Sequence, residues 1–158
     1  QLLAEEPRLL NEKYVEFDET ALEAASHVGN RPIAEFLLAQ GAPMNLYTAA
    51  MFGLTDEVAA FLDESPELVN GNGVHGISLL YHAALSGNVE LVEMLAERGN
   101  TQSPDMPLLG AVGYGRYDMV QWLLNRGADT TATNFQNKTA LQIAQDRQDE
   151  ALITLLTE

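Results

Sequence analysis

The chain has 158 residues, enough for one domain with a real core or for one continuous array of small repeats. Eight Lys and Arg against 23 Asp and Glu give a net charge of −15, and such a surface repels the phosphate backbone of nucleic acids. No apolar run approaches the ~20 residues of a membrane span. We therefore expect neither nucleic-acid binding nor a membrane anchor.

The acidic charge is distributed unevenly. Residues 1–79 hold thirteen acids and three bases, a net −10, whereas residues 80–158 hold ten acids and five bases, a net −5. The excess of acidic residues either keeps the protein soluble or steers a basic partner toward the N-terminal half. Cysteine is absent, which excludes disulfides and thiolate metal sites in this sequence. The redox compartment stays open, with the cytoplasm as the default expectation.

Residues 1–10 parallel a later segment of the chain. The stretch "LLAEEPRLLN" from Leu2 matches "FLDESPELVN" from Phe61. The later copy has the pattern of a helix followed by an exit turn. We expect residues 1–10 to be the remaining half of a repeat, so that the sequence begins inside an array.

Five repeats of one pattern follow. Each predicts a short helix with small central residues, then a turn, then a second helix with apolar residues at i, i+3 and i+4. A unit of this size cannot bury its apolar face alone and must stack on its neighbours. The repeats cover residues 20–41, 44–65, 78–99, 106–127 and 139–158. The central small residues include Ala25, Ala49, Ala83, Ala111 and Ala144, and the turn residues are Gly29, Gly53, Gly87, Gly115 and Gln148.

The start of the first helix in each repeat carries a resemblance to a known family. The six-residue stretches from Thr20, Ser78, Met106 and Thr139 resemble the T-P-L-H-x-A signature of the ankyrin repeat family. The resemblance implies one domain over residues 1–158, an all-α solenoid of stacked helix-turn-helix units with short β-hairpin fingers. It also implies a non-catalytic module, without cofactor or metal, that binds a protein partner on its concave face and fingers.

Two departures from the family pattern give further expectations. The signature histidine is replaced in every repeat, so helix capping should depend on Thr20, Ser78 and Thr139, with weaker helix starts in repeats 2 and 4. The connections also differ: thirteen residues from Ser65 to Ser78 and twelve from Gly127 to Thr139, but only three from Gly41 to Met44. The long connections predict fingers, and the short one has no room for a finger.

The stretch "GNGVHG", Gly71 to Gly76, fits the G-x-G-x-x-G spacing of dinucleotide-binding loops. However, the residues before this stretch have a helical pattern, whereas a dinucleotide-binding loop follows a buried strand. In the repeat register Gly76 shares its place with Asp18 and Asn137, and all three residue types tolerate a left-handed backbone. The register therefore predicts a hairpin turn in a mobile finger beside the binding face.

The repeat register also predicts which residues face a partner. The two positions after the central small residues, together with positions near the helix starts, form an aromatic and Met-containing stripe across repeats 2 to 4. Aromatic residues are enriched at interfaces, although packing against the next repeat is the alternative. The predicted partner-binding residues are Tyr47, Met51, Phe52, Tyr81, His82, Leu85 and Tyr114.

The three histidines, His27, His75 and His82, have no metal-ligand spacing such as H-E-x-x-H. We expect exposed or partner-facing imidazoles and no metal site. Three hypotheses of function follow: a protein-binding module, a structural spacer within a longer protein, and a dinucleotide-binding enzyme that rests only on Gly71 to Gly76.

Overall fold

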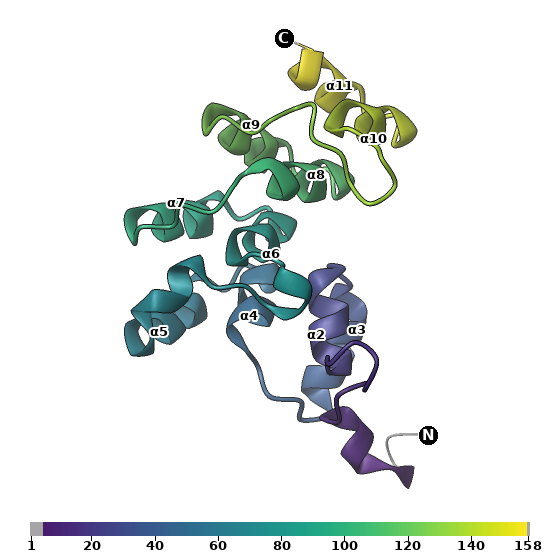
Figure 1. The fold of residues 1–158 in the computed structure, drawn as a ribbon, viewed down its shortest axis with the longest axis vertical. Coiled ribbons are helices and arrows are strands. Elements are labelled where there is room, and N and C mark those ends of the chain that lie inside the picture. Colours follow the sequence, from purple (N-terminus) through teal and green to yellow (C-terminus); the bar gives the residue numbers. More distant parts are fainter. Residues whose placement is uncertain (1–4, 158) are drawn as a thin grey trace.

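The computed structural model describes residues 5–157 and consists of paired helices that stack side by side (Figure 1). Within these residues, no helix has both the length and the apolar character needed to cross a bilayer. The α-helices are α2 (Ala21–His27), α3 (Arg31–Ala39), α4 (Leu46–Phe52), α5 (Thr55–Glu64), α6 (Leu79–Ser86), α7 (Val89–Glu97), α8 (Asp105–Gly113), α9 (Tyr117–Asn125), α10 (Ala140–Asp146) and α11 (Glu150–Thr157). Short 3-10 turns are η1 (Pro7–Leu10), η2 (Pro66–Asn70) and η3 (Val74–Gly76).

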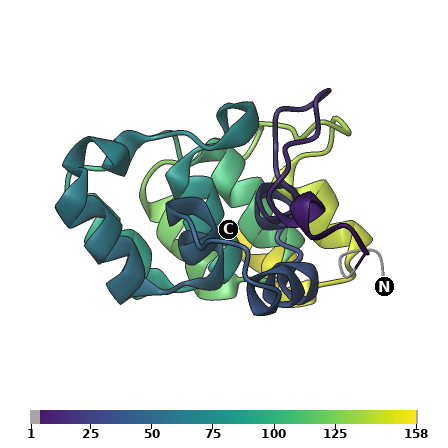
Figure 2. The same ribbon diagram turned by 90° about the horizontal axis from the view of Figure 1, so that it is seen from below.

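The helices form two rows. The inner helices, α2, α4, α6, α8 and α10, contact one another in chain order. The outer helices α5, α7, α9 and α11 form a second row behind them (Figures 1 and 2). The predicted all-α solenoid of stacked helix-turn-helix units is therefore confirmed.

Small side chains let the inner helices approach one another closely. Ala49, Ala83, Ala111 and Ala144 are fully buried, as their central place in each repeat predicts. Larger apolar residues of the outer helices, such as Leu95, complete one core that runs from repeat 2 to repeat 5. Each pair thus buries its apolar face against its neighbours, as expected for a solenoid.

Polar side chains begin most of the inner helices. Thr20, Ser78 and Thr139 accept hydrogen bonds from backbone N–H groups of the first turn, as predicted. The prediction of a weak start in repeat 2 is wrong, because the Asn45 side chain accepts the Thr48 N–H at 2.9 Å. Asn45 stands one place later in the signature than Thr20, Ser78 and Thr139, because α4 begins one residue later in the register. Within the described residues, α8 begins without a side-chain cap, which agrees with the weak start predicted for repeat 4.

Within residues 5–157, three hairpin fingers project from the inner row, each with one antiparallel bridge between residues. We call them the first finger (Tyr14–Glu19), the second finger (Asn72–Ser78) and the third finger (Thr133–Thr139). Asp18, Gly76 and Asn137 have φ values of 51°, 71° and 58°. The left-handed turn predicted from the repeat register is therefore present in all three. No bridge occurs in the described chain between Gly41 and Met44, as its length predicts.

The first repeat does not continue the stack in the regular way. Its outer helix α3 is not stacked on α5, although later outer helices stack on one another (Figures 1 and 2). Its apolar residues, including Leu22 and Leu37, form a separate core with Met51 of α4 and Leu85 of α6. The α2–α3 pair therefore packs partly across the ends of α4 and α6.

A contact between repeats 1 and 4 accompanies this arrangement. The Tyr114 hydroxyl, in the turn after α8, donates a hydrogen bond to the Val28 carbonyl at the end of α2. A Cβ atom on Gly29 would lie 2.7 Å from the Tyr114 ring, and Gly29 has φ of 65°. A glycine at position 29 is thus required both by the backbone conformation and by the tyrosine packed on it.

Candidate binding groove

An open groove of about 980 Å³ lies between the second and third fingers, the inner helices and the end of α2. Its lining is mostly apolar and comes from segments far apart in the chain. Side chains that line the groove include Val28, His75, Tyr81, Met106, Tyr114 and Phe135. We call this region the groove.

The groove exposes several large apolar side chains. Phe135, in the third finger, is 90% exposed, and Met106, Val28 and Tyr114 are about half exposed. Exposed apolar side chains gathered around one concave surface are characteristic of a contact site. Asp105 and amide side chains such as Gln102 supply polar groups on one wall.

Three of the predicted partner-binding residues lie in the interior instead. Met51, His82 and Leu85 are between 1% and 3% exposed, so the prediction that they face a partner is wrong. For Met51 and Leu85 the physical reason is the position of repeat 1. Leu22 and Leu37 pack over Met51 and Leu85, which would face the concave surface in a regular stack.

The other four predicted residues have different environments. Tyr81 and Tyr114 line the groove, and Tyr81 is half-buried against the repeat 1 core. Phe52 is covered by Arg31, whose guanidinium carbon lies 5.1 Å from the ring centroid. The partly buried Tyr47 packs against the second finger, outside the groove. The structure thus brings only two of the seven residues into the groove.

His82 is enclosed in the stack and does not face a partner. Its Nδ1 lies 2.9 Å from the Ser78 carbonyl, and the rings of Tyr47 and Tyr81 flank it with centroids 5.2 and 6.0 Å away. Burial lowers the pKa of His82 to about 4, against a smaller opposing effect of the Ser78 carbonyl. The imidazole is therefore neutral at pH 7.

The glycines of "GNGVHG" are explained by packing. A Cβ on Gly73 would lie 3.2 Å from the Tyr47 ring, and one on Gly71 would lie 2.9 Å from the Leu68 carbonyl and 3.0 Å from the Tyr47 hydroxyl. Helix α5 and the turn η2 precede this loop, so the strand of a dinucleotide-binding unit does not occur there.

Hydrogen bonds attach the base of the second finger to the next connection. The Gln102 amide donates to the Gly71 carbonyl at 2.8 Å, and the Thr101 N–H donates to the Asn70 side chain at 2.8 Å. Together with the Tyr47 packing, these bonds hold the finger at its base, and His75 and Gly76 at its tip line the groove. The mobility of the tip stays a prediction.

Sequence reasoning did not identify Met106 or Phe135 as groove residues. Met106 is the first residue of the repeat 4 signature, and Phe135 lies two residues before the turn residue Asn137. The repeat register aligns the side chains at the finger tips as well as the turn glycine, and it places Phe135 at the tip of the third finger. In the register Val28 precedes the turn residue Gly29, as Tyr114 precedes Gly115, but it belongs to repeat 1, outside the stripe predicted for repeats 2 to 4. The position of repeat 1 brings it to the groove.

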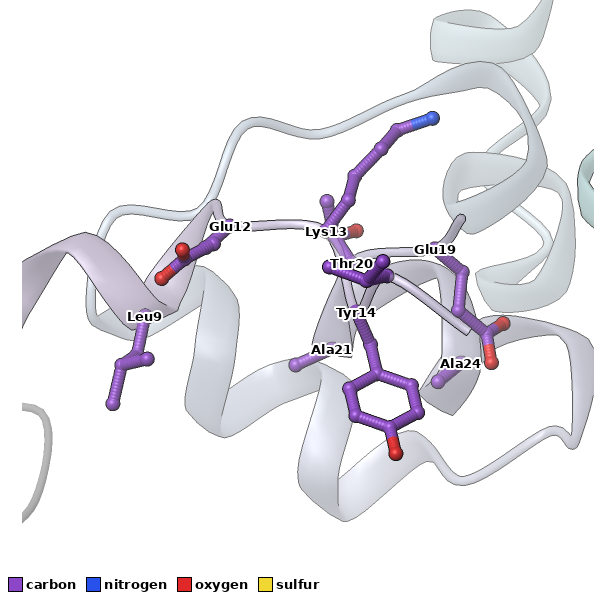
Figure 3. Close-up of a pocket in the computed structure, with 9 residues that line it drawn as sticks. Leu9, Glu12, Lys13, Tyr14, Glu19, Thr20, Ala21 and Ala24 are labelled. Atoms are coloured by element: carbon purple, nitrogen blue, oxygen red, sulfur yellow. The ribbon is translucent and has the colours of Figure 1, made fainter. Parts of the chain in front are cut away.

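A second hollow, of about 510 Å³, lies beside α2 at the N-terminal end of the described chain (Figure 3). Ala21 and Ala24 form its floor, with Leu9, Glu12 and Tyr14 around it. In repeats 3 and 5 the residues equivalent to Ala21 are Leu79 and Ala140, which the preceding repeats cover completely. The hollow is therefore an uncovered stacking face. The predicted half-repeat at residues 1–10 falls partly outside the described residues, which begin at residue 5.

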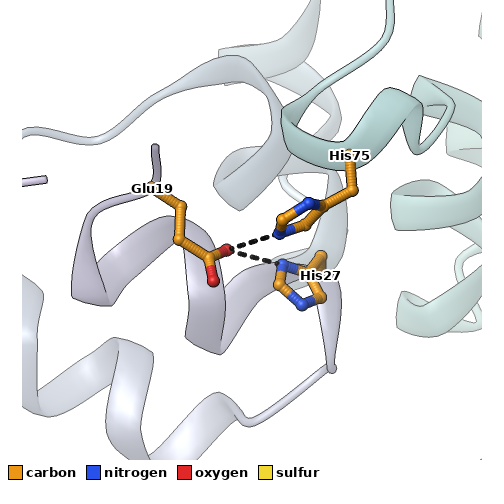
Figure 4. Close-up of side chains that lie close together, drawn as sticks. All are labelled: Glu19, His27 and His75. Carbon is orange, nitrogen blue, oxygen red and sulfur yellow. Dashed lines mark hydrogen bonds and ion pairs between the residues drawn. The ribbon is translucent and has the colours of Figure 1, made fainter. Parts of the chain in front are cut away.

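A cluster of one carboxylate and two imidazoles joins the first and second fingers (Figure 4). The Glu19 Oε2 atom lies 3.3 Å from His75 Nε2 and 3.3 Å from His27 Nδ1. The two imidazole planes are nearly perpendicular, at 88°. The side chains of His27 and His75 are 17% and 39% exposed, and both line the groove. The expectation of exposed or partner-facing imidazoles is wrong for His82, which is buried.

Burial is the main effect on the ionisation of His27. It lowers the pKa of His27, and His75 lowers it further, whereas the Glu19 carboxylate and the Glu23 backbone raise it. Although His27 Nδ1 is close to Glu19, it is not aligned for a hydrogen bond. Within residues 5–157 this nitrogen is buried without a hydrogen-bond partner.

The paired helices, glycine turns and fingers define a helical repeat solenoid. The chain belongs to the ankyrin repeat family: a family model described as ankyrin repeats (3 copies) matches residues 21–106, and a second, ankyrin repeats (many copies), matches residues 95–144. Ankyrin repeats are in general protein-protein interaction modules and are typically non-catalytic.

The proteins to which the chain is similar include two larger proteins. "Ankyrin repeat and SAM domain-containing protein 6" of Rattus norvegicus is 28% identical over 160 residues, which cover 88% of this chain and 18% of that protein. "E3 ubiquitin-protein ligase hecd-1" of Caenorhabditis elegans is 36% identical over 78 residues, which cover 48% of this chain and 3% of that protein. The chain thus spans less than a fifth of the length of either relative.

Proposed function

We propose that the chain is a non-catalytic protein-binding module and that its partner docks in the groove. The observation that supports this most strongly is the exposure of Val28, Met106, Tyr114 and Phe135 around one concave surface. Interfaces concentrate their binding free energy in a few aromatic and apolar side chains at the centre of the contact. Membership of the ankyrin repeat family supports the same class of function.

The charge of the chain favours a partner with a basic rim around its apolar centre. The net charge is −15, and the N-terminal half is the more acidic. Long-range attraction of this kind accelerates association and weakens as salt rises. Binding in the groove should therefore become slower in high salt, while the apolar contact persists.

The experiment compares two groove variants with one control by quantitative capture of partners from a native lysate. Phe135→Ser and Met106→Ser remove exposed apolar side chains from the groove, and Phe36→Ser removes an aromatic that is 55% exposed on α3, outside the groove. We expect groove variants to lose roughly tenfold or more in capture, because interface hot spots cost ~2 kcal/mol or more on truncation. Phe36→Ser should capture as much as the unchanged protein.

Thermal unfolding of each variant separates a loss of binding from a loss of folding. Equal capture by Phe135→Ser and Phe36→Ser, at unchanged unfolding midpoints, would contradict docking in the groove. A structural spacer is the alternative function, and it predicts that no substitution in the groove alters capture. A dinucleotide-binding enzyme gains no support, because the Gly71 and Gly73 backbone is packed on Tyr47.

A further inference from the structure

The cluster of Glu19, His27 and His75 brings metal-ligand atoms together from three separate segments. Glu19 ends the first finger, His27 ends α2, and His75 lies at the tip of the second finger (Figure 4). One ligand atom from each side chain lies within 4.8 Å of the other two. Sequence separation of 56 residues between Glu19 and His75 explains why no motif revealed the cluster.

The spacing of these atoms fits four-coordinate geometry. Zinc binds imidazole nitrogen and carboxylate oxygen at about 2.0–2.2 Å, so two ligands on a tetrahedron lie about 3.3 Å apart. Both nitrogen-to-oxygen distances in the cluster are 3.3 Å. The two imidazole nitrogens lie within 4.8 Å of each other, and rotation of the half-exposed His75 ring would adjust this separation.

We propose that Glu19, His27 and His75 form a binding site for one divalent transition-metal cation of the zinc class, with an open fourth position. Two imidazoles and one carboxylate suit zinc and its neighbours, whereas magnesium and calcium prefer oxygen ligands throughout. A metal site here is separate from partner binding, because the bound ion would join two fingers of the same chain.

One feature of the cluster favours occupancy by a cation. His27 Nδ1 is buried without a hydrogen-bond partner in residues 5–157, and coordination would satisfy this nitrogen. The hydrogen bond between His75 and Glu19 would be replaced by two bonds to the ion.

The bound ion would connect two fingers across the place where a finger is missing. Because the connection from Gly41 to Met44 forms no finger, the first and second fingers are neighbours along the array. His75 has φ of 58°, and this left-handed conformation presents its imidazole at the finger tip. The ion would thereby fix one end of the groove, to which His27 and His75 also belong.

The test uses untagged protein stripped of metal by a chelator. Titration calorimetry with zinc should give one equivalent bound, and titration with cobalt(II) should give the intense visible absorption of a four-coordinate ion. Glu19→Gln, His27→Gln and His75→Asn each remove one ligand, and asparagine tolerates the left-handed backbone at position 75. Zinc affinity should fall by more than about 100-fold in each, because even loss of an outer-shell partner costs 10–100-fold.

The control is Glu16→Gln, an exposed acid on the same finger that contacts Tyr14 and lies outside the cluster. It should bind zinc as the unchanged protein does, and excess magnesium should not compete. Circular dichroism confirms that each variant is folded. Zinc binding that survives His75→Asn, or that magnesium displaces, would overturn the proposal, because it would show diffuse attraction to the acidic surface. Absence of binding to the unchanged protein would overturn it as well.

Hydrogen exchange gives a second measurement that does not depend on affinity. Zinc should slow exchange of backbone amides in residues 14–19 and 72–78 together, because the ion ties both fingers. The third finger, residues 133–139, should be unaffected and serves as an internal reference. Equal protection of all three fingers would contradict a site at Glu19, His27 and His75.

Discussion

The junctions among repeats 2 to 5 and the junction of repeat 1 with repeat 2 differ in their contacts. In the regular junctions a side chain of the later repeat donates to a carbonyl at the C-terminal end of the earlier inner helix: Asn88 to Gly53 at 2.9 Å, Arg116 to Leu85 at 3.2 Å and Arg147 to Gly113 at 2.7 Å. At the first junction the direction is reversed, because Arg31 of repeat 1 donates to the Phe52 carbonyl at 2.8 Å. The turn of repeat 1 is instead approached by Tyr114 of repeat 4.

The difference shows that similar repeat sequences do not ensure similar junctions. The helices of repeat 1 carry the same pattern as the others, yet their core is separate and lies across the ends of α4 and α6. The connection from Gly41 to Met44 is the shortest between repeats, and it forms no finger. A short connection restricts how the second pair of helices can be placed, and here the result is a turned first repeat.

The largest expected effect distinguishes the two cores. Leu95 and Leu37 occupy the same place in α7 and α3, and are 0% and 5% exposed. Leu95→Ala should lower the free energy of unfolding of the array by about 3 kcal/mol, because it leaves a cavity in the continuous core. Leu37→Ala should change the main urea transition by less than about 1 kcal/mol and release repeat 1 locally. Urea unfolding with hydrogen exchange of α2 and α3 measures both, and equal shifts of the main transition would contradict two cores.

The contact of Tyr114 with Gly29 can be isolated by a double-mutant cycle. Gly29→Ala should cost about 2 kcal/mol, of which about 1 kcal/mol is left-handed backbone strain and the rest is displacement of Tyr114. Gly127→Ala is the control, since φ there is 82° and a Cβ atom added at this position would have no heavy atom of the described residues within 4 Å. It should cost about 1 kcal/mol, from strain alone.

In a Tyr114→Ala background, Gly29→Ala should cost no more than Gly127→Ala does. Chemical denaturation of the four proteins of the cycle gives the coupling free energy. A coupling free energy near zero would mean that repeat 4 does not hold repeat 1 in place.

His82 lies between Tyr47 and Tyr81, where the two cores meet. The pH dependence of stability tests the burial of its imidazole. The pKa of His82 is about 4 in the folded protein and ~6.5 in the unfolded chain, so the unfolded chain binds more protons between these values. Stability should therefore fall as pH falls through this window, by about 2 kcal/mol from pH 7 to pH 5. His82→Gln should remove this part of the dependence in urea unfolding. An identical pH profile in the variant would show that other groups cause it.

The smallest expected effect concerns the helix that follows the short connection. Asn45→Ala should cost about 1 kcal/mol, because the Thr48 N–H loses its capping oxygen. Ser78→Ala, which removes the cap of the helix after the second finger, is the matched variant. Thermal unfolding should show similar losses for the two. No loss in Asn45→Ala would mean that buried Leu46 and Thr48 alone position the start of α4.

Much of the fold could be predicted from local patterns in the sequence. The central alanines, the glycine turns and the left-handed residues Asp18, Gly76 and Asn137 all have the predicted conformations or packing. These features depend on nearby residues, which repeat in register. The candidate site was harder to predict, since five of the seven predicted residues lie outside the groove and Phe135 and Met106 take their place.

The sequence by itself determined the repeat architecture, because hydrophobic period, small central residues and turn conformations act over a few residues. The tertiary structure alone decided the burial of Met51 and Leu85, the approach of Tyr114 to Gly29 and the meeting of Glu19 with His27 and His75. Each depends on the angle at which repeat 1 joins the array. That angle is set by packing between residues up to 86 positions apart, for which the periodic pattern carries no signal.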